Sequence, residues 1–317
     1  MVWFYILIFL ISCSFLYFAG EMVIECLAKI ARFLGWKEFV VAFFLMAFSC
    51  SIPNFFVGII SALNKVPELS FADIIGGNVV ELALLGGLAA LISRMGLSTQ
   101  SRTVQGSTIF GIGTALLPLI LISDGNLSRV DGILLILTFI FYIFWLFNKK
   151  ERFEKIYDGI KEPVRLKFFL KNLAIFIVSF FLLILAAKGV VKSSLFFANY
   201  LKVSLSLIGI LIVSLGNSLP DLSFILRAAK KSQDWLILGD IMGGTVITAT
   251  LVLGIVALIH PIKILDFSPF LIGFFFLIIS ALFFLFFVRT DRKVTKKEGI
   301  FLLSLYVIFF IVEILIK

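Results

Sequence analysis

Acidic and small polar residues occur at matched positions in the two halves of this chain. The first half contains Ser-Ile-Pro-Asn at residues 51–54 and Asp-Ile-Ile-Gly-Gly-Asn-Val-Val-Glu at 73–81. The second half contains Asn-Ser-Leu-Pro-Asp at 217–221 and Asp-Ile-Met-Gly-Gly-Thr-Val-Ile-Thr at 240–248, and the two copies are offset by 167 residues throughout. Carboxylate, amide, hydroxyl and carbonyl oxygens are the ligands that hard cations such as Ca²⁺ and Na⁺ prefer. The pattern therefore predicts cation binding.

Glu81 and Asp221 are the strongest single candidates for this chemistry. Each is expected well inside an apolar span, where an unpaired ionised carboxylate costs about 3 kcal/mol or more. No Lys or Arg lies nearby in the same spans to pair with them. A bound cation is the natural partner. The alternative is a carboxyl that stays protonated and is hydrogen-bonded to a neighbour.

The two prolines of the repeat are expected to interrupt their spans. Pro53 and Pro220 each lie in the middle of an apolar segment, where proline removes a backbone donor and frees the carbonyl four residues earlier. In lipid such a carbonyl needs a partner, and a cation can serve. Ala47 and Ser214, six residues before each proline, are candidate carbonyl donors near the break. The alternative is a kink patched by serine hydroxyls.

Glycine pairs follow the prolines in both halves. Gly77 and Gly244 each precede a polar residue, Glu81 or Thr248, by one helical turn, which places both on one helix face. The glycines could expose backbone to a site, or could serve close helix packing alone. Asp73, three residues after Ser70, fits a capping box near a helix start, and its counterpart Asp240 is interpreted in the same way. The alternative for both is a role at the mouth of the ion pathway.

The composition is that of a polytopic helical membrane protein. Of 317 residues 61% are hydrophobic and 15% are charged, and the mean hydropathy is +1.16. A soluble domain has about 25% charged residues. Apolar runs of about 20 residues suit membrane-spanning helices. We expect ten spans, at 2–20, 38–63, 70–93, 103–123, 130–147, 167–187, 203–228, 235–259, 268–288 and 299–316.

The long polar segment 148–166 divides the chain into two halves of five spans, 1–147 and 167–317. An odd number of spans per half inverts the second half relative to the first, which places a binding site near the bilayer midplane between the repeats. Most Lys and Arg residues fall in cytoplasmic loops when both termini face outward, so the positive-inside rule favours that orientation and a cytoplasmic linker. The net charge of +9 is attributed to these loops and not to nucleic-acid binding. We expect an integral protein of the plasma membrane.

The paired motifs resemble those of the cation/Ca²⁺ antiporter superfamily, which includes the sodium/calcium exchangers. Its members look like two inverted five-helix repeats, each with a Gly-Thr-Ser-x-Pro-Glu motif and a Gly-Ser-Asn-x-x-Asn/Asp motif. The form Asn-Ser-x-x-Asp at 217–221 also resembles the cation/calcium exchanger branch. The resemblance covers nearly the whole chain. It implies an all-α polytopic fold of ten transmembrane helices in two inverted five-helix repeats.

The resemblance also implies a set of ion ligands drawn from both repeats. In the first repeat the family's ligand positions fall on Cys50, Ser51, Asn54, Gly77 and Glu81. In the second repeat they fall on Asn217, Ser218, Asp221, Gly244 and Thr248.

The carboxylates depart from the family's pattern. Asn54 stands where the family has Glu, Glu81 stands where it usually has Asn, and Thr248 replaces an Asp. One carboxylate has therefore moved to the neighbouring helix of the first repeat. Two carboxylates remain, Glu81 and Asp221, and these can neutralise one Ca²⁺ or two Na⁺.

We therefore expect a secondary antiporter that exchanges Ca²⁺ for Na⁺ by alternating access, with the first and sixth spans sliding across a core of motif-bearing spans. Its partners are these ions and the lipid bilayer, and no cofactor is expected. One alternative is a Ca²⁺/H⁺ or other cation/H⁺ antiporter, with H⁺ or Li⁺ as counter-ion and Glu81 exchanging its proton. Another is a channel or a non-transporting membrane scaffold. No nucleophile–base pair or metal-hydrolase pattern is present, so an enzyme is disfavoured.

Overall fold

The structure, a computed structural model, describes residues 2–33, 51–99, 102–147, 166–230, 233–290 and 292–316. The predicted ligand positions Ala47 and Cys50 and nearly all of the predicted linker lie outside these ranges. The helices of the first half are α1 (Val2–Phe33), α3 (Ile52–Leu63), α4 (Pro67–Val79), η1 (Val80–Leu85), α5 (Gly86–Ile92), α6 (Arg102–Leu121), η2 (Ile122–Asp124) and α7 (Arg129–Phe147). Those of the second half are α8 (Leu166–Leu201), α9 (Leu205–Ile208), η4 (Gly209–Val213), α10 (Ser214–Asn217), α11 (Leu219–Lys230), α12 (Asp234–Val246), η5 (Ile247–Val252), α13 (Leu253–Ile259), η6 (Ser268–Phe270), α14 (Leu271–Thr290) and α15 (Lys296–Leu315).

Eight helices in the described part of the chain are long and apolar enough to cross a membrane. A ninth candidate is the pair Leu205–Asn217 and Leu219–Lys230, which is bent by 43° at Ser218. The remaining predicted span, 38–63, is described only from residue 51, where α3 forms its second half. The predicted all-helical membrane fold is confirmed, and ten spans are consistent with it. The first and sixth helices, α1 and α8, are much longer than predicted.

The 167-residue repeat extends to the helix boundaries themselves. Three consecutive elements of the first half begin and end 167 residues before their counterparts, which are α4 and α12, η1 and η5, and α5 and α13. Helices α3 and α11 are related by the same offset of 167 residues. The N-terminal turns of α7 and α15 also match, because Asp131 accepts hydrogen bonds from Ser128 just as Glu298 accepts them from Thr295.

Two short antiparallel ladders join one repeat to the other. Strand β1 (Leu97–Ser98) pairs with β4 (Lys293–Val294), and β2 (Asn126–Leu127) pairs with β3 (Ile262–Lys263). Leu97 lies opposite Val294, and Leu127 lies opposite Ile262. In each ladder a strand from the first half meets one from the second, as a two-fold relation between the halves requires.

Pro220 lies at an interruption of its predicted span, as expected, because α11 begins directly after the 43° bend at Ser218. Pro53 and Pro220 are the second residues of α3 and α11. There the missing backbone donor costs nothing, because the first helical N–H groups have no partner within the helix.

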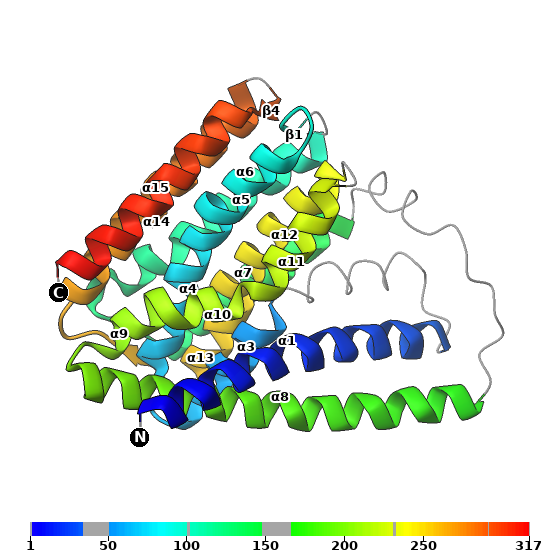
Figure 1. Cartoon of the computed structure of the whole chain (residues 1–317), viewed down its shortest axis with the longest axis vertical. Helices are drawn as coiled ribbons and strands as arrows, with labels where there is room; N and C mark the ends of the chain where they lie inside the picture. The colour runs from blue at the N-terminus through cyan, green and yellow to red at the C-terminus, as the bar shows by residue number, and fades with distance from the viewer. Residues whose placement is uncertain are drawn as a thin grey trace.

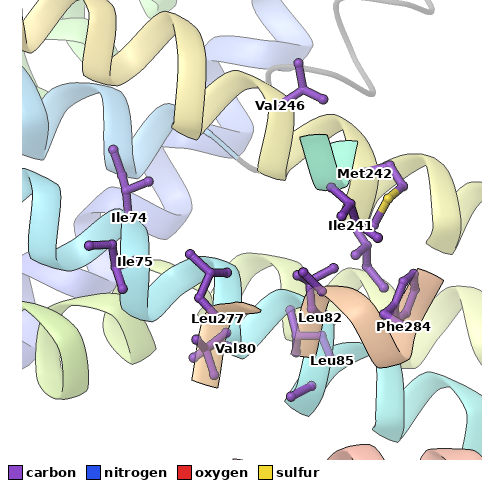
Figure 2. Packing of buried hydrophobic residues seen from close by; sticks show 14 of the residues in the cluster. Ile74, Ile75, Val80, Leu82, Leu85, Ile241, Met242, Val246, Leu277 and Phe284 are labelled. Atoms are coloured by element: carbon purple, nitrogen blue, oxygen red, sulfur yellow. The ribbon is translucent and has the colours of Figure 1, made fainter. Parts of the chain in front are cut away.

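The motif-bearing helices form the interior of the protein. Helices α1 and α8 lie side by side along one flank, whereas α14 and α15 cover the opposite flank (Figure 1). The spans Pro67–Ile92 and Leu236–Ile259 are mostly buried, whereas α1 is mostly exposed. Apolar side chains of α4, η1, α12 and α14 fill the space around them (Figure 2). The motifs that are predicted to bind cations therefore lie in the most buried part of the described fold.

Gly76 sets how closely the two halves approach. A Cβ at this position would meet the backbone carbonyl of Ile210 in η4, with the carbonyl carbon at 2.8 Å. Backbone cannot move aside as a flexible side chain can, so only glycine fits. A Cβ at Gly243, the residue at the same place in the second repeat, would have no heavy atom within 4 Å.

We expect Gly76→Ala to destabilise the protein by about 2 kcal/mol or more, because overpacking against backbone forces the helices apart. The matched variant Gly243→Ala should leave stability within about 0.5 kcal/mol of the wild type. Thermal unfolding of both variants in detergent tests this difference. Equal unfolding temperatures for the two variants would contradict the packing role of Gly76.

Candidate functional site

The site is centred on the contact between α4–η1 of the first repeat and α12–η5 of the second. The hydroxyl of Thr245 lies 2.7 Å from Oε2 of Glu81. The hydroxyl of Thr248 lies 3.3 Å from Oδ1 of Asn78. Since Asn78 and Thr245 are equivalent under the 167-residue offset, as are Glu81 and Thr248, these are two copies of one contact across the repeat interface.

The two copies differ in charge. Glu81 is 4% exposed, and its hydrogen-bond partner is the neutral hydroxyl of Thr245. That hydroxyl also lies 2.8 Å from the carbonyl of Ile241, four residues earlier, so its single proton serves either acceptor. Neither ion pair found in the described part of the chain involves Glu81. A buried carboxylate without a positive partner favours a cation nearby.

Gly244 makes room for the Glu81 carboxylate. A Cβ built on Gly244 would lie 3.0 Å from Oε1 of Glu81 and 3.4 Å from its carboxyl carbon. Gly77, the equivalent residue of the first repeat, faces open space, with no heavy atom within 4 Å of such a Cβ. The absence of a side chain at Gly244 therefore leaves the space that the Glu81 carboxylate occupies.

Each motif-bearing span widens into a π-helical turn at its polar residue. Glu81 lies in η1 and Thr248 lies in η5, each immediately after the helix that carries the glycine pair. Single π-helical turns inside α-helices occur frequently at functional sites. A third π segment, η4, lies against Gly76 and leads to the break before α11.

Asp73 belongs to the site, and its expected role as a helix cap is wrong. It lies in the middle of α4, six residues after the helix begins at Pro67, and is 1% exposed. Its Oδ2 accepts a hydrogen bond of 2.9 Å from Nδ2 of Asn217 in α10. Ser70 makes no capping bond, since its hydroxyl has no hydrogen-bond partner among the described residues. Asp240 likewise lies inside α12 and is buried.

The break between α10 and α11 carries the remaining second-repeat candidates. The carbonyl of Ser214 accepts hydrogen bonds from both the backbone N–H (3.0 Å) and the hydroxyl (2.8 Å) of Ser218. These hydrogen bonds from Ser218 would therefore have to break before the carbonyl of Ser214 could bind an ion. Asp221 is 3% exposed in the first turn of α11, where the helix dipole favours a negative charge.

The first-repeat counterparts are less completely described. Ser51 precedes α3, is 1% exposed and has a hydroxyl without a partner among the described residues. Asn54 is 6% exposed in the first turn of α3. Ala47 and Cys50 lie outside the described residues, so their predicted roles stay predictions.

All ten described candidates are buried, as a midplane site requires. The structure brings Glu81 directly to Gly244, and Ser218 to Ser214. Sequence reasoning missed Asn78 and Thr245 as contact residues, although the offset that relates them was visible. Within the ranges that the structure describes, no three His, Cys, Asp or Glu side chains gather into a metal centre. Any cation here would be held largely by neutral oxygens, with one or two carboxylates.

Comparisons with known proteins bear on what this site does. A family model described as sodium/calcium exchanger protein matches residues 4–148 and 171–315. The chain is 26% identical to sodium/calcium exchanger MaX1 of Methanosarcina acetivorans, over 96% of this chain and 97% of that protein. It is 22% identical to inner membrane protein YrbG of Escherichia coli, over 77% and 76%. Among solved structures, the sodium-calcium exchanger NCX_Mj soaked with Na⁺ and Sr²⁺ has the same fold, with a TM-score of 0.64, 23% identity and coverage of 97% and 98%.

We expect Gly244→Ala to weaken Ca²⁺ binding about fivefold, since displacing the Glu81 carboxylate by a few tenths of an ångström costs about 1 kcal/mol. Gly77→Ala should bind Ca²⁺ within about twofold of the wild type, because its methyl group enters open space. Equilibrium binding of ⁴⁵Ca²⁺ to the purified variants measures both values. Equal effects of the two substitutions would show that Gly244 does not position Glu81.

Proposed function

Since this chain belongs to the sodium/calcium exchanger protein family, we propose that it is a secondary antiporter that exchanges Ca²⁺ for Na⁺ across a membrane. Membership identifies a membrane transporter and not an enzyme. The proposed exchange of Ca²⁺ for Na⁺ rests on the buried carboxylate of Glu81, whose hydrogen-bond partner across the repeat interface is a neutral hydroxyl. A cation supplies the positive charge that this arrangement lacks.

The ligand set we propose follows the motif positions of both repeats. Its charged members are Glu81 and Asp221, one from each repeat. The oxygens around them suit Ca²⁺ and Na⁺ better than soft ions, which prefer thiolate or imidazole. The neutral members are Ser51, Asn54, Ser214, Asn217, Ser218 and Thr248, with backbone at Gly77 and Gly244 and the undescribed Ala47 and Cys50. Two carboxylates neutralise one Ca²⁺ or two Na⁺, and this limit on charge makes the ions compete.

We propose that α1 and α8 switch access by sliding across the motif-bearing core. Support comes from their packing against each other along one flank and from their exposed outer faces (Figure 1). Gly216 of α10 touches α1 closely, since a Cβ there would lie 2.9 Å from Sγ of Cys13. A shift of α1 would therefore uncover the residues beside Asn217.

The topology that accompanies this proposal comes from the charge pattern. We propose two inverted repeats, 1–147 and 167–317, joined by a cytoplasmic linker at 148–166. Both termini would face outward from the plasma membrane. The excess of Lys and Arg on one side of the predicted spans supports this orientation.

The test is ⁴⁵Ca²⁺ uptake into proteoliposomes that hold Na⁺, K⁺, Li⁺ or protons in excess inside. We expect outward Na⁺ to drive uptake. Glu81→Gln and Asp221→Asn should each reduce uptake to the level of empty liposomes, because the transported ion loses one of its two charged ligands. Glu313→Gln, which neutralises a buried carboxyl of α15 outside the site, should transport like the wild type.

The internal ions separate this proposal from the second candidate, a cation/H⁺ antiporter. That candidate is favoured by the same neutral pairing of Glu81, since a proton can replace the cation on its carboxylate. Uptake driven by a proton gradient and indifferent to Na⁺ would establish it. Wild-type flux in either carboxylate variant would overturn the ligand assignment.

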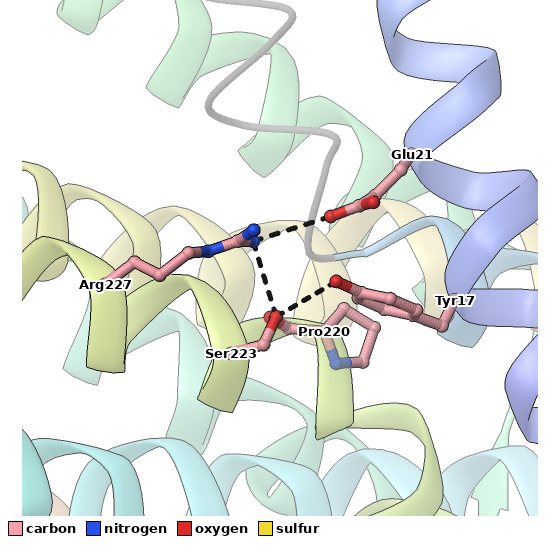
Figure 3. A network of polar contacts seen from close by, with 5 residues as sticks. All are labelled: Tyr17, Glu21, Pro220, Ser223 and Arg227. Carbon is pink, nitrogen blue, oxygen red and sulfur yellow. Dashed lines mark hydrogen bonds and ion pairs between the residues drawn. The ribbon is translucent and has the colours of Figure 1, made fainter.

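A polar network ties α1 to the helix that carries Asp221. Arg227 of α11 lies 3.5 Å from both Glu21 and Ser223, and the hydroxyl of Ser223 lies 3.3 Å from that of Tyr17 (Figure 3). Ser223 also donates to the carbonyl of Pro220 at 2.9 Å. The network joins the proposed sliding helix to the break at the site, and sliding must disrupt it.

We expect Arg227→Gln to change the initial rate of exchange by a factor of about two to five, since exposed ion pairs contribute at most about 1 kcal/mol. The affinity for Ca²⁺ should stay the same. Lys29→Gln is the matched control, because its ion pair with Glu25 lies within α1 and joins no second helix. If both variants alter the rate alike, the Arg227 contact does not control the motion of α1.

A further inference from the structure

We propose that Asp73 and Asn217 form a second cation subsite, separate from the one at Glu81, in which a carboxylate oxygen and an amide oxygen bind the ion together. This inference rests on the proposed function, since it adds a charged ligand to the same transport site. Neither the family's motifs nor the predicted ligand set includes Asp73. The argument comes from the hydrogen-bonding needs of the two side chains.

The orientation of the Asn217 amide is fixed by its neighbour. Nδ2 of Asn217 lies 2.9 Å from Oδ2 of Asp73. An ionised carboxylate only accepts hydrogen bonds, so the amide must present its NH₂ group to Asp73 and direct its oxygen elsewhere. The reverse orientation would place two acceptors in contact.

Two buried acceptors are left over by this bond. Oδ1 of Asp73 and Oδ1 of Asn217 are both inaccessible to solvent, and neither has a hydrogen-bond donor among the residues that the structure describes. Each residue is 1% exposed. Buried polar groups in native proteins are nearly always paired, and an exception calls for an explanation such as an ion. Two orphaned oxygens on hydrogen-bonded neighbours are best satisfied by one hard cation.

The position of the pair agrees with a transport subsite. Asp73 is bonded to Asn217, which follows Gly216, where a Cβ would lie 2.9 Å from Sγ of Cys13 in α1, so the pair lies close to the proposed sliding helix. Asp73 and Glu81 are eight residues apart in one helical span, a rise of about 12 Å. An ion at Asp73 would therefore be distinct from an ion at Glu81.

The subsite changes the charge available for exchange. Glu81 and Asp221 together neutralise two positive charges, and an ionised Asp73 adds a third. Three carboxylates match three Na⁺, or one Ca²⁺ with one monovalent ion. Under the repeat, Asp73 corresponds to Asp240 and Asn217 corresponds to Cys50, a residue that has no amide oxygen. The two halves thus cannot offer the same subsite.

The experiment is equilibrium binding of ²²Na⁺ and ⁴⁵Ca²⁺ to purified full-length protein in detergent. Asp73→Asn keeps the size of the side chain and removes its charge. We expect it to weaken binding of at least one ion by about tenfold or more, because even indirect partners of metal ligands contribute this much. Asp73→Glu, which restores the charge, should bind more tightly than Asp73→Asn. Glu313→Gln, a buried carboxyl outside the site, should bind like the wild type.

Asn217→Ser provides a second route if Asp73→Asn does not fold, since it removes the whole amide group, including the oxygen proposed to bind the ion, and should also weaken binding. Wild-type affinity for both ions in every folded variant of Asp73 and Asn217 would overturn the subsite while leaving the proposed exchange intact. If the wild-type protein binds neither ion, the proposed function and this inference both fail.

Discussion

The fold depends on the burial of carboxylates in a part of the protein where no water can solvate them. Glu81 and Asp73 are almost inaccessible, and each is hydrogen-bonded to a neutral side chain, Thr245 or Asn217. A charge buried in this way is costly unless it is paired. The protein holds these groups in place by packing the motif-bearing helices at the centre and covering them with α1 and α8 on one flank. Under the proposed function, a cation that enters is the transported ion and also the missing partner of these groups.

The two halves of the repeat share their backbone arrangement at the site, but they differ in the charge of the side chains placed there. Glu81 meets Thr245 as Thr248 meets Asn78, at equivalent positions and from equivalent elements. The backbone framework is therefore duplicated, including both π-helical turns. The charges are not duplicated, since a carboxylate in one copy of the contact is a hydroxyl in the other. We propose that the two equivalent halves allow the protein to alternate between two states, and that the uneven set of ligands determines which ions it accepts.

The membrane spans and the internal repeat could largely be predicted from the sequence, because apolar runs and repeated motifs are visible in short stretches of it. The offset between the two copies of the motif extends to the limits of α4 and α12 and to the N-terminal turns of α7 and α15. The interruption of the span at Pro220 could be predicted from the proline itself, whereas the sequence alone does not show that both prolines lie in the first turn of a new helix. The lengths of α1 and α8 were underestimated, because their polar ends continue as helix beyond the apolar part.

The contacts across the repeats could not be predicted in the same way. Asp73 follows Ser70 with the spacing of a capping box, and this spacing alone predicts a role as a helix cap. Its true partner, Asn217, is 144 residues away and meets it only because Gly76 lets α4 approach η4. The same holds for Thr245, which looks like an ordinary helix residue until the fold brings it to Glu81. The role of a residue that depends on a distant partner cannot be recognised from the residues next to it in the sequence.

We propose that cations occupy the buried carboxylates at the repeat interface, and anomalous diffraction from crystals grown with Ca²⁺ tests this occupancy. We expect a calcium peak about 2.3–2.6 Å from a carboxylate oxygen of Glu81, Asp221 or Asp73, the distance that Ca²⁺ keeps from its oxygen ligands. Calcium peaks confined to surface carboxylates, with Thr245 and Asn217 still the only partners of Glu81 and Asp73, would contradict it.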